Sequence, residues 1–309
     1  MPSEFERELA RLIVDSDELV GAAALELQVT VAALHDDLVT YLSAANISAA
    51  DIAAIQANVD AMFMPAALEI LRQGMNKHQE AWLLGQGSAN RLFGVFEVEG
   101  LFTITTAPEA FAATQALTVN RIVGITEQMR LAIRSEIIQT VMAGQSPLTA
   151  MQNITNIVGI RDMAGFRELG STGLNYKAER ILRTELHAVE QMARFLAIED
   201  RRVSDPKIID AWMSTGDIRT RDTHLAAHGQ RKDQTENGIF WVGGFPCEFP
   251  GDVQLPAQER INCRCEIFSY KEDWGTMDEL MGGLNQEIID EKQRRVDERA
   301  AKARRKKAA

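Results

Sequence analysis

Apolar side chains recur every three or four residues over most of the first 80 positions, which is the spacing of an amphipathic helix. One series begins at Leu9 and resumes through Leu34, and a second runs from Ile52 to Phe63. Pro65 is expected to kink or restart the second helix, because proline removes a backbone donor. We predict an acidic helical hairpin or bundle over residues 1–90, with breaks at Gln73–Asn76 and Gly85–Ser88.

The pattern changes at residues 91–105, which are rich in aromatic and β-branched side chains around a central Glu-Gly. This composition predicts a β-hairpin whose phenylalanines either pack in a core or form a docking element for a neighbouring subunit. A threonine cap followed by proline and glutamate then opens a helix over 106–142. Another short helix follows, so residues 91–174 are expected to form a connecting region. The phenylalanines concerned are Phe93, Phe96 and Phe102.

Residues 175–275 alternate between helical and strand patterns. We expect a long helix over 177–200, a short one over 219–228, and strands over 208–213, 239–242 and 265–268. From Met277 onward the sequence reads as a charged helix, which gives a tail over 276–309. The predicted fold class is therefore α+β and predominantly α-helical: a helical N-terminal region, a small α+β domain and a charged helical tail.

Composition narrows the class of protein without identifying it. The chain is 46% hydrophobic and 25% charged, as globular proteins are. No uninterrupted apolar run reaches the roughly 18 residues that span a bilayer, so we expect no membrane-spanning segment. The acidic N-terminus is unlike a signal peptide, and three cysteines do not make a disulfide framework. We therefore expect synthesis in a cytoplasm-like, reducing compartment.

Charge is unevenly distributed along the chain, whose net charge is −11. Residues 1–80 hold 13 acidic and 4 basic side chains, whereas residues 291–309 hold 9 basic and 3 acidic ones. The acidic body should repel nucleic acid, so only the tail is suited to salt-dependent contact with DNA, or with a protein partner. The alternative is an ordinary solvated helix end. The tail residues proposed for contact are Arg294, Arg295, Arg299, Lys302, Arg304, Arg305, Lys306 and Lys307.

Four short motifs follow one another in the second half of the chain: Arg183-Thr-Glu185, then Trp212 through His224, then Pro250-Gly-Asp252, then Asn262-Cys-Arg-Cys265. Each is weak alone, but the ordered set resembles the Mu F-like family of phage minor head proteins, also called phage head morphogenesis proteins. The resemblance covers about residues 176–270.

The resemblance implies a virion structural protein, not an enzyme. It implies a minor head protein in the capsid interior at the portal vertex, made in the host cytoplasm and acting in head morphogenesis and genome packaging or delivery. Its expected partners are the portal protein and other inner head or capsid proteins. It is expected to be multimeric in the particle and to touch packaged DNA, without sequence preference, through the tail.

The polar residues of the motifs are expected to form an internal structural cluster, with Arg219 or Arg221 clamping Glu185 and Asp252. An acid/base or anion-binding cluster is the alternative interpretation. The predicted structural set is Arg183, Glu185, Trp212, Asp217, Arg219, Arg221, His224, Asp252, Asn262 and Arg264.

Two other chemistries remain open for the same segment. His224 and His228 stand four apart on a predicted helix, and with Cys263 and Cys265 they would make a tetrahedral zinc set. The simpler interpretation is that the cysteines pack as small buried thiols, with no cofactor. A hydrolase or nuclease, zinc-dependent or using Cys263 or Ser214 with His224 and Asp217, is the rival function, although no nucleophile-elbow motif surrounds either residue.

Overall fold

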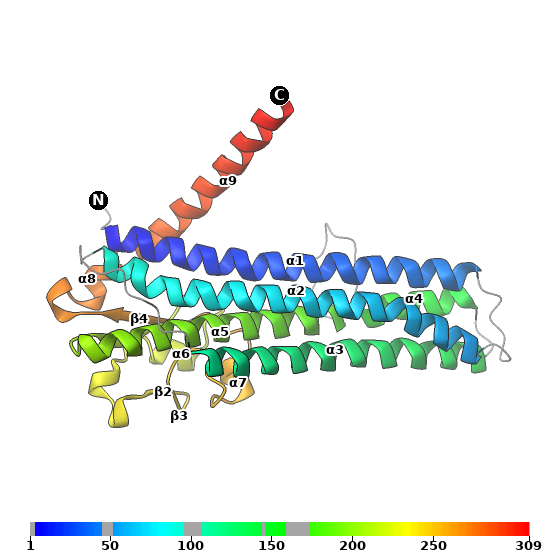
Figure 1. Ribbon diagram of the computed structural model, residues 1–309, viewed down its shortest axis with the longest axis horizontal. Coiled ribbons are helices and arrows are strands. Elements are labelled where there is room, and N and C mark those ends of the chain that lie inside the picture. The colour runs from blue at the N-terminus through cyan, green and yellow to red at the C-terminus, as the bar shows by residue number, and fades with distance from the viewer. Residues whose placement is uncertain (1–3, 45–51, 96–106, 144–145, 159–173, 309) are drawn as a thin grey trace. The chain divides into compact units, whose positions relative to one another are not determined.

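A computed structural model describes residues 4–44, 52–95, 107–143, 146–158 and 174–308 (Figure 1). The chain forms two compact units. Unit 1 comprises Met1–Val20, Glu80–Phe111 and Leu186–Ala309, and unit 2 comprises Gly21–Gln79 and Ala112–Glu185. Four consecutive segments were expected from the sequence, whereas each unit combines segments that are distant in the chain.

The secondary structure of unit 2 is entirely helical among its described residues. It contains α4 (Pro147–Val158) and parts of four long helices: α1 (Glu4–Ala44), α2 (Ile52–Gly94), α3 (Pro108–Met142) and α5 (Leu174–Ser204). Its core is built from the apolar stripes of these helices. Typical members are Leu27, Val59, Ile133, Ile154 and Leu182, all almost fully buried. The helical spacing predicted for the first 80 residues is thereby confirmed over the described positions.

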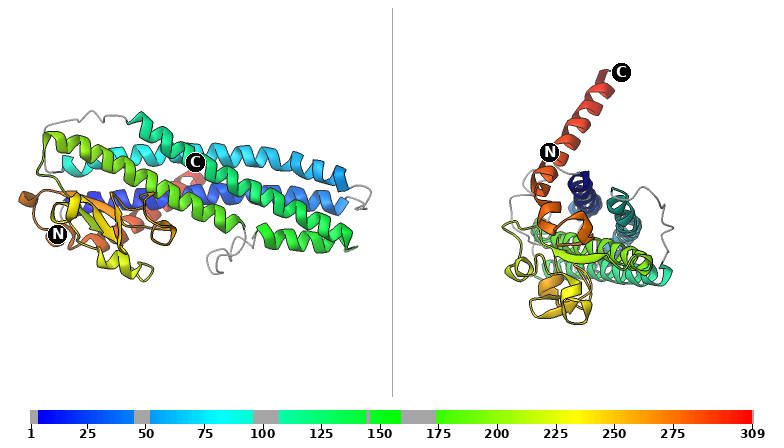
Figure 2. Two further views of the ribbon diagram at one scale, coloured as in Figure 1. Left: turned by 90° about the horizontal axis from the view of Figure 1, so that it is seen from below. Right: turned by 90° about the vertical axis from the view of Figure 1, so that its left-hand side faces the viewer.

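Unit 1 joins helices to small β-elements (Figure 2). Strand β1 (Ile209–Met213) pairs antiparallel with β4 (Glu266–Tyr270), and β2 (Phe240–Val242) pairs antiparallel with β3 (Phe245–Cys247). The remaining elements are α6 (Asp222–Ala226), α7 (Ala257–Arg260), α8 (Met277–Met281), α9 (Leu284–Ala308) and three 3-10 turns, η2 (Lys232–Gln234), η3 (Glu236–Gly238) and η4 (Glu272–Trp274).

Two apolar clusters form the interior of unit 1. The larger one packs Phe5 of α1 and Phe93 of α2 with Phe268 of β4. The smaller one contains eight buried residues of the segment after α5, with Trp212 and Phe240 as its largest side chains. A cluster of this size provides little hydrophobic stabilisation for the loops around it.

The predicted breaks in the second helix are wrong, because α2 continues through Pro65, Gly74 and Gly85. A Cβ atom at Gly74 would lie 2.2 Å from Cδ1 of Ile122 on α3. A Cβ atom at Gly85 would lie 2.1 Å from the carbonyl oxygen of Glu190 on α5. These glycines therefore allow close helix packing and do not end the helix.

The predicted hairpin over 91–105 is wrong at its start, because Arg91–Gly94 form the last turn of α2. Phe93 is buried in the core of unit 1, which favours packing over docking for this residue. Phe96 and Phe102 lie outside the described residues.

The remaining elements agree with the sequence. The helices predicted over 106–142 and 177–200 are α3 and α5, and the strands predicted over 208–213, 239–242 and 265–268 are β1, β2 and β4. The helix predicted over 219–228 is shorter, since α6 ends at Ala226. The predicted fold class, α+β and predominantly helical, is confirmed.

Among the described helices, α1 alone is long and apolar enough to cross a membrane by length and composition. A core helix passes the same test, and Leu27, Val31 and Leu34 of α1 pack in the core of unit 2. The expectation that no segment spans a membrane stays a prediction.

Candidate functional site

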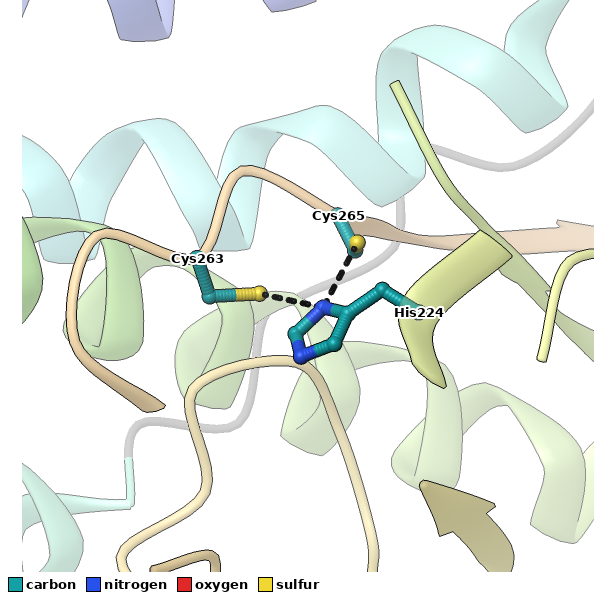
Figure 3. Close-up of side chains that lie close together, drawn as sticks. All are labelled: His224, Cys263 and Cys265. Atoms are coloured by element: carbon teal, nitrogen blue, oxygen red, sulfur yellow. Dashed lines mark hydrogen bonds between the residues drawn. The ribbon is translucent and has the colours of Figure 1, made fainter. Parts of the chain in front are cut away.

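His224 of α6 lies between the two cysteines of the Cys-Arg-Cys motif (Figure 3). Its Nδ1 atom is 3.2 Å from Sγ of Cys265 and 3.6 Å from Sγ of Cys263. The three ligand atoms all lie within 4.8 Å of one another, and the three side chains are buried. The sequence correctly grouped these residues.

The backbone before the cysteines explains this convergence. Asn262 follows α7 with a φ of 55°, a left-handed conformation that asparagine tolerates better than most side chains. The N–H of Cys263 donates to the carbonyl of Arg260, which closes the turn. The chain then enters β4 at Glu266. The order Asn-Cys-Arg-Cys therefore sets a turn that places both sulfur atoms beside α6.

The Pro250-Gly-Asp252 motif forms a loop that packs against α5. Gly251 has a φ of 86°, and a Cβ atom there would lie 3.2 Å from the Cα and Cβ atoms of Ala188 on α5. Asp252 accepts hydrogen bonds from the backbone N–H groups of Glu248 and Gln254, each at 2.9 Å. The motif thus fixes a loop against α5, and the Asp252 side chain stabilises that loop by accepting its backbone hydrogen bonds.

Glu259 of α7 forms the second layer around His224. Its Oε2 atom lies 3.1 Å from Nε2 of His224 and accepts a 2.8 Å hydrogen bond from the hydroxyl of Thr223. The ring of Trp212 packs edge-on against the imidazole at 5.7 Å. With Nε2–H donating to the carboxylate, Nδ1 presents its lone pair to the two sulfur atoms.

His187 of α5 is buried and interacts electrostatically with Cys263. Burial lowers the pKa of His187, but hydrogen bonding to Cys263 and the charges of Glu266, Cys263 and Glu190 raise it to about 9 overall. Hydrogen bonding from Cys265 lowers the pKa of Cys263 well below its usual range, with His187 acting in the same direction against burial. The pair of cysteines therefore favours a thiolate at Cys263.

A buried charged network lies next to this cluster, and the sequence interpretation missed it. Arg194 donates to Glu190 at 2.9 Å and to Glu266 at 2.5 Å, and all three side chains are almost fully buried. Gln191 donates to Glu266 and accepts the N–H of Ile267. Burial and Glu266 raise the pKa of Glu190 to about 7. The available signal was a run of polar residues on the otherwise apolar face of α5.

His187 and Glu259 were also missed, although both adjoin motifs that were noticed. His187 follows Arg183-Thr-Glu185 by two residues, and Glu259 precedes Asn262 by three. Adjacency to a motif was the signal that would have found them.

The predicted structural cluster is assembled only in part. Asp217 accepts two 2.7 Å hydrogen bonds from Arg264, and this pairing holds the pKa of Asp217 well below its usual range. Arg221 donates to the backbone carbonyls of Glu259 and Ile261, while Arg219 is largely exposed. The predicted clamp of Arg219 or Arg221 on Asp252 is wrong, because Asp252 binds backbone N–H groups instead.

Two arginine-glutamate pairs of the first motif belong to unit 2. Arg183 pairs with Glu179 one turn earlier, and Glu185 pairs with Arg121 of α3. Glu185 therefore belongs to the helical unit 2, where its ion pair with Arg121 links α5 to α3.

The predicted four-residue zinc set is wrong in one member. His228 is exposed, and its Nδ1 accepts the backbone N–H of Ser214 at 3.1 Å. The reason is that α6 ends at Ala226, so the helical spacing between His224 and His228 does not hold.

The basic tail is α9, and part of its charge is paired within unit 1. Lys292 binds Asp17, and Arg295 binds Asp15 and Glu18 of α1. Arg299 also binds Glu18, and Arg294 pairs with Glu291 of its own helix. Lys302 and Arg304 are exposed, whereas the side chains of Arg305, Lys306 and Lys307 lie outside the described ones.

Three of the four motifs contribute residues to unit 1, and part of the chain matches a known family. Residues 132–268 match the family described as Phage Mu protein F like protein. The match begins earlier than the resemblance noted in the motifs and includes the end of α3. No curated protein and no solved structure matches the chain.

The match confirms the resemblance, and it extends from the end of α3 through β4. Within this Mu F-like region lie all four motifs, the cysteine-histidine cluster and the buried network. The family indicates a phage head morphogenesis protein and association with the virion.

Proposed function

We propose that this protein is a minor head protein that binds the portal vertex inside the capsid and acts in head assembly and in packaging or delivery of the genome. The match of residues 132–268 to the Mu F-like family carries this proposal. The partners proposed are the portal protein and other inner head proteins, with several copies of the chain in each particle.

Burial of the cysteine-histidine cluster favours this role over the hydrolase alternative. His224 is 1% exposed, Cys265 2% and Cys263 4%. A hydrolytic nucleophile has to reach a substrate, and these atoms are enclosed by protein. The cluster is therefore better suited to holding the fold together.

The helices of unit 2 supply a candidate surface for neighbouring head proteins. Leu25 and Val29 of α1 are more than half exposed, as are Met64 and Leu68 of α2. Each pair is spaced four residues apart, so it lies on one face of its helix. Exposed apolar side chains grouped in this way mark protein contacts more often than isolated ones do.

Site-specific cross-linking in assembled particles tests the proposal. A photo-reactive amino acid at Leu68 should give a cross-link to the portal protein or to an inner head protein. The same group at Ile218, an exposed position in unit 1, controls for random capture. Cross-links from Leu68 only to the major capsid protein, or absence of the protein from particles, would contradict the proposal.

The tail is proposed to contact packaged DNA through its last residues. The basic side chains of α9 before residue 300 pair with acids of α1 or of α9 itself, so those from Lys302 onward are the better candidates. Such contacts would be salt-dependent and would not depend on sequence.

A further inference from the structure

The distances in the cysteine-histidine cluster are those of a metal site. Zinc binds sulfur at about 2.3 Å and imidazole nitrogen at about 2.0–2.1 Å with tetrahedral angles, which separates the two ligand atoms by about 3.6 Å. The Nδ1 atom of His224 lies 3.6 Å from Sγ of Cys263 and 3.2 Å from Sγ of Cys265. One ion bound to all three therefore requires shifts of only a few tenths of an ångström at these edges.

The surroundings of His224 also have the form expected of a metal ligand. Imidazoles that bind zinc through one nitrogen commonly donate the other N–H to a carboxylate, which fixes the tautomer and orients the ring. Glu259 stands at Nε2 at 3.1 Å and is itself held by Thr223 at 2.8 Å. The nitrogen facing the sulfur atoms is consequently the one with a free lone pair.

His187 of α5 is the histidine proposed as the fourth ligand. It is 6% exposed and interacts electrostatically with Cys263, while its Nε2 atom has no hydrogen-bond partner among the described residues. Two thiolates and two neutral imidazoles around Zn²⁺ give a set with no net charge. This balance suits side chains that are between 1% and 6% exposed, because an unbalanced charge is costly to bury.

We propose that His224, Cys263 and Cys265, completed by His187, bind one structural Zn²⁺. The set replaces the exposed His228 with a histidine from α5. It joins α5, α6 and the turn before β4, which are separated in sequence by up to 78 residues. The proposal rests on this geometry and does not depend on the role in the phage head.

Because the nearby apolar cluster is small, a bound ion would add stability to this part of unit 1. Among the described positions, eight buried residues are grouped there, two of which are the proposed ligands Cys263 and Cys265, and long loops surround them. Small domains with limited cores commonly gain stability from a metal or a disulfide. All three cysteines are free thiols, so a zinc ion would provide the cross-link.

Metal analysis of the purified full-length protein is the first test. The wild-type chain should hold about one zinc per chain after gel filtration. Cobalt added to chelator-treated protein should give the visible absorption of a tetrahedral ion and a sulfur-to-cobalt charge-transfer band. A chain that retains no zinc and gives no such spectrum would overturn the proposal.

Variants assign the ligands. Cys263→Ser, Cys265→Ser and His224→Gln should each lose bound zinc, and His187→Gln should weaken cobalt binding and alter its spectrum. Cys247→Ser is the matched control, because Cys247 is also a buried thiol but lies outside the cluster. Zinc retained by the Cys263 or Cys265 variant, or lost equally in the Cys247 variant, would contradict the assignment.

A folding measurement guards against variants that lose zinc by misfolding. Wild-type protein is unfolded and refolded with zinc or with a strong chelator, and its Tm is compared. The proposal predicts a lower Tm in chelator, restored by added zinc. An identical Tm in both conditions would show that no structural ion is bound.

Discussion

Asp252 illustrates how a single side chain supports the loop beside the cluster. It is 3% exposed, and its two oxygens accept the N–H groups of Glu248 and Gln254. Asp252→Ala leaves these donors without partners, which should cost about 1–3 kcal/mol of unfolding free energy. Denaturant titration of the full-length chain measures this loss.

Arg183 and Arg219 serve as controls for that measurement, since the sequence motifs assign them the same structural role as Asp252. Arg183 is 46% exposed in its pair with Glu179, and Arg219 is 76% exposed. Surface ion pairs contribute about 0–1 kcal/mol, so Arg183→Ala and Arg219→Ala should change stability little. A loss as large as that of Asp252→Ala would contradict this interpretation.

His78 of α2 makes the stability of unit 2 depend on pH. Burial lowers its pKa to about 4, against an unfolded value near 6.5, despite the hydrogen bond to Thr114. The folded state therefore binds fewer protons, and its stability falls as pH drops from 6.5 to 4. The loss should be on the order of 2 kcal/mol after allowance for partial solvation.

The test compares pH profiles of stability for wild type and His78→Gln. The variant should lose stability less steeply between pH 6.5 and 4. Parallel profiles for His78→Gln and wild type would show that His78 does not titrate as proposed.

The sequence motifs identified individual residues of the site more reliably than they identified the residues that those side chains contact. The cysteine pair and His224 were grouped correctly, because a Cys-x-Cys in a chain with three cysteines is a specific signal. His228 was included because helical spacing was assumed beyond the point where α6 ends. His187 was not found, although it lies two residues after the Arg183-Thr-Glu185 motif, because that motif was assigned to a different polar set.

At the scale of elements, glycine is the residue whose meaning depends most on tertiary structure. Gly85 and Gly87 both lie in α2, but only Gly85 faces α5 at contact distance. Gly85→Ala should therefore destabilise the protein, since its Cβ would lie 2.1 Å from a backbone oxygen that cannot move freely. Circular dichroism during thermal unfolding measures the change.

Gly87→Ala is the matched control on the same helix, two residues away. Within the described part of the chain, nothing lies within 4 Å of the position that a Cβ would take there. Alanine should therefore stabilise the helix by about 0.5–1 kcal/mol. Both substitutions replace glycine with alanine, and the structure predicts that Gly85→Ala lowers stability whereas Gly87→Ala raises it. Equal effects would show that the close approach of α2 and α5 is not as described.

Helical periodicity predicted most elements, because it is a local property of each segment. The long helices and three of the strands follow from apolar spacing alone. The breaks predicted at Gly74 and Gly85 do not occur. Glycine is needed at both positions because a side chain there would block the close contact with a neighbouring helix. The division into two units was also beyond local patterns, because each unit combines segments from both halves of the chain.

At the scale of the whole molecule, the contrast between an acidic body and a basic tail is weaker than the sequence alone indicates. Acids of α1 neutralise several bases of α9, so the basic residues after 300 are the best candidates for DNA contact. Deleting residues 301–309 removes five basic side chains and should abolish binding to random-sequence duplex DNA. Before deletion, the log–log salt slope should be about −4.

A charge-reversed control separates DNA contact from folding. Arg299→Glu breaks the pair with Glu18 but leaves the last nine residues intact, so it should lower stability slightly and keep most DNA binding. Binding that survives deletion of 301–309 would place the contact elsewhere. If neither the full-length nor the shortened chain binds DNA, contact with a protein partner becomes the remaining role proposed for the tail.

Residues near the start of the chain contact the segment before α9 within unit 1, where Glu6 accepts the backbone N–H of Gly283 at 2.6 Å. During synthesis, the first helix therefore emerges from the ribosome long before the residues that complete its surroundings exist. Unit 2 has all of its segments once Glu185 has been translated, whereas unit 1 also needs the residues from Leu186 onward. A truncated product would thus carry a finished helical unit and an unfinished second one, and only chains that reach Gly283 would supply Glu6 with this donor.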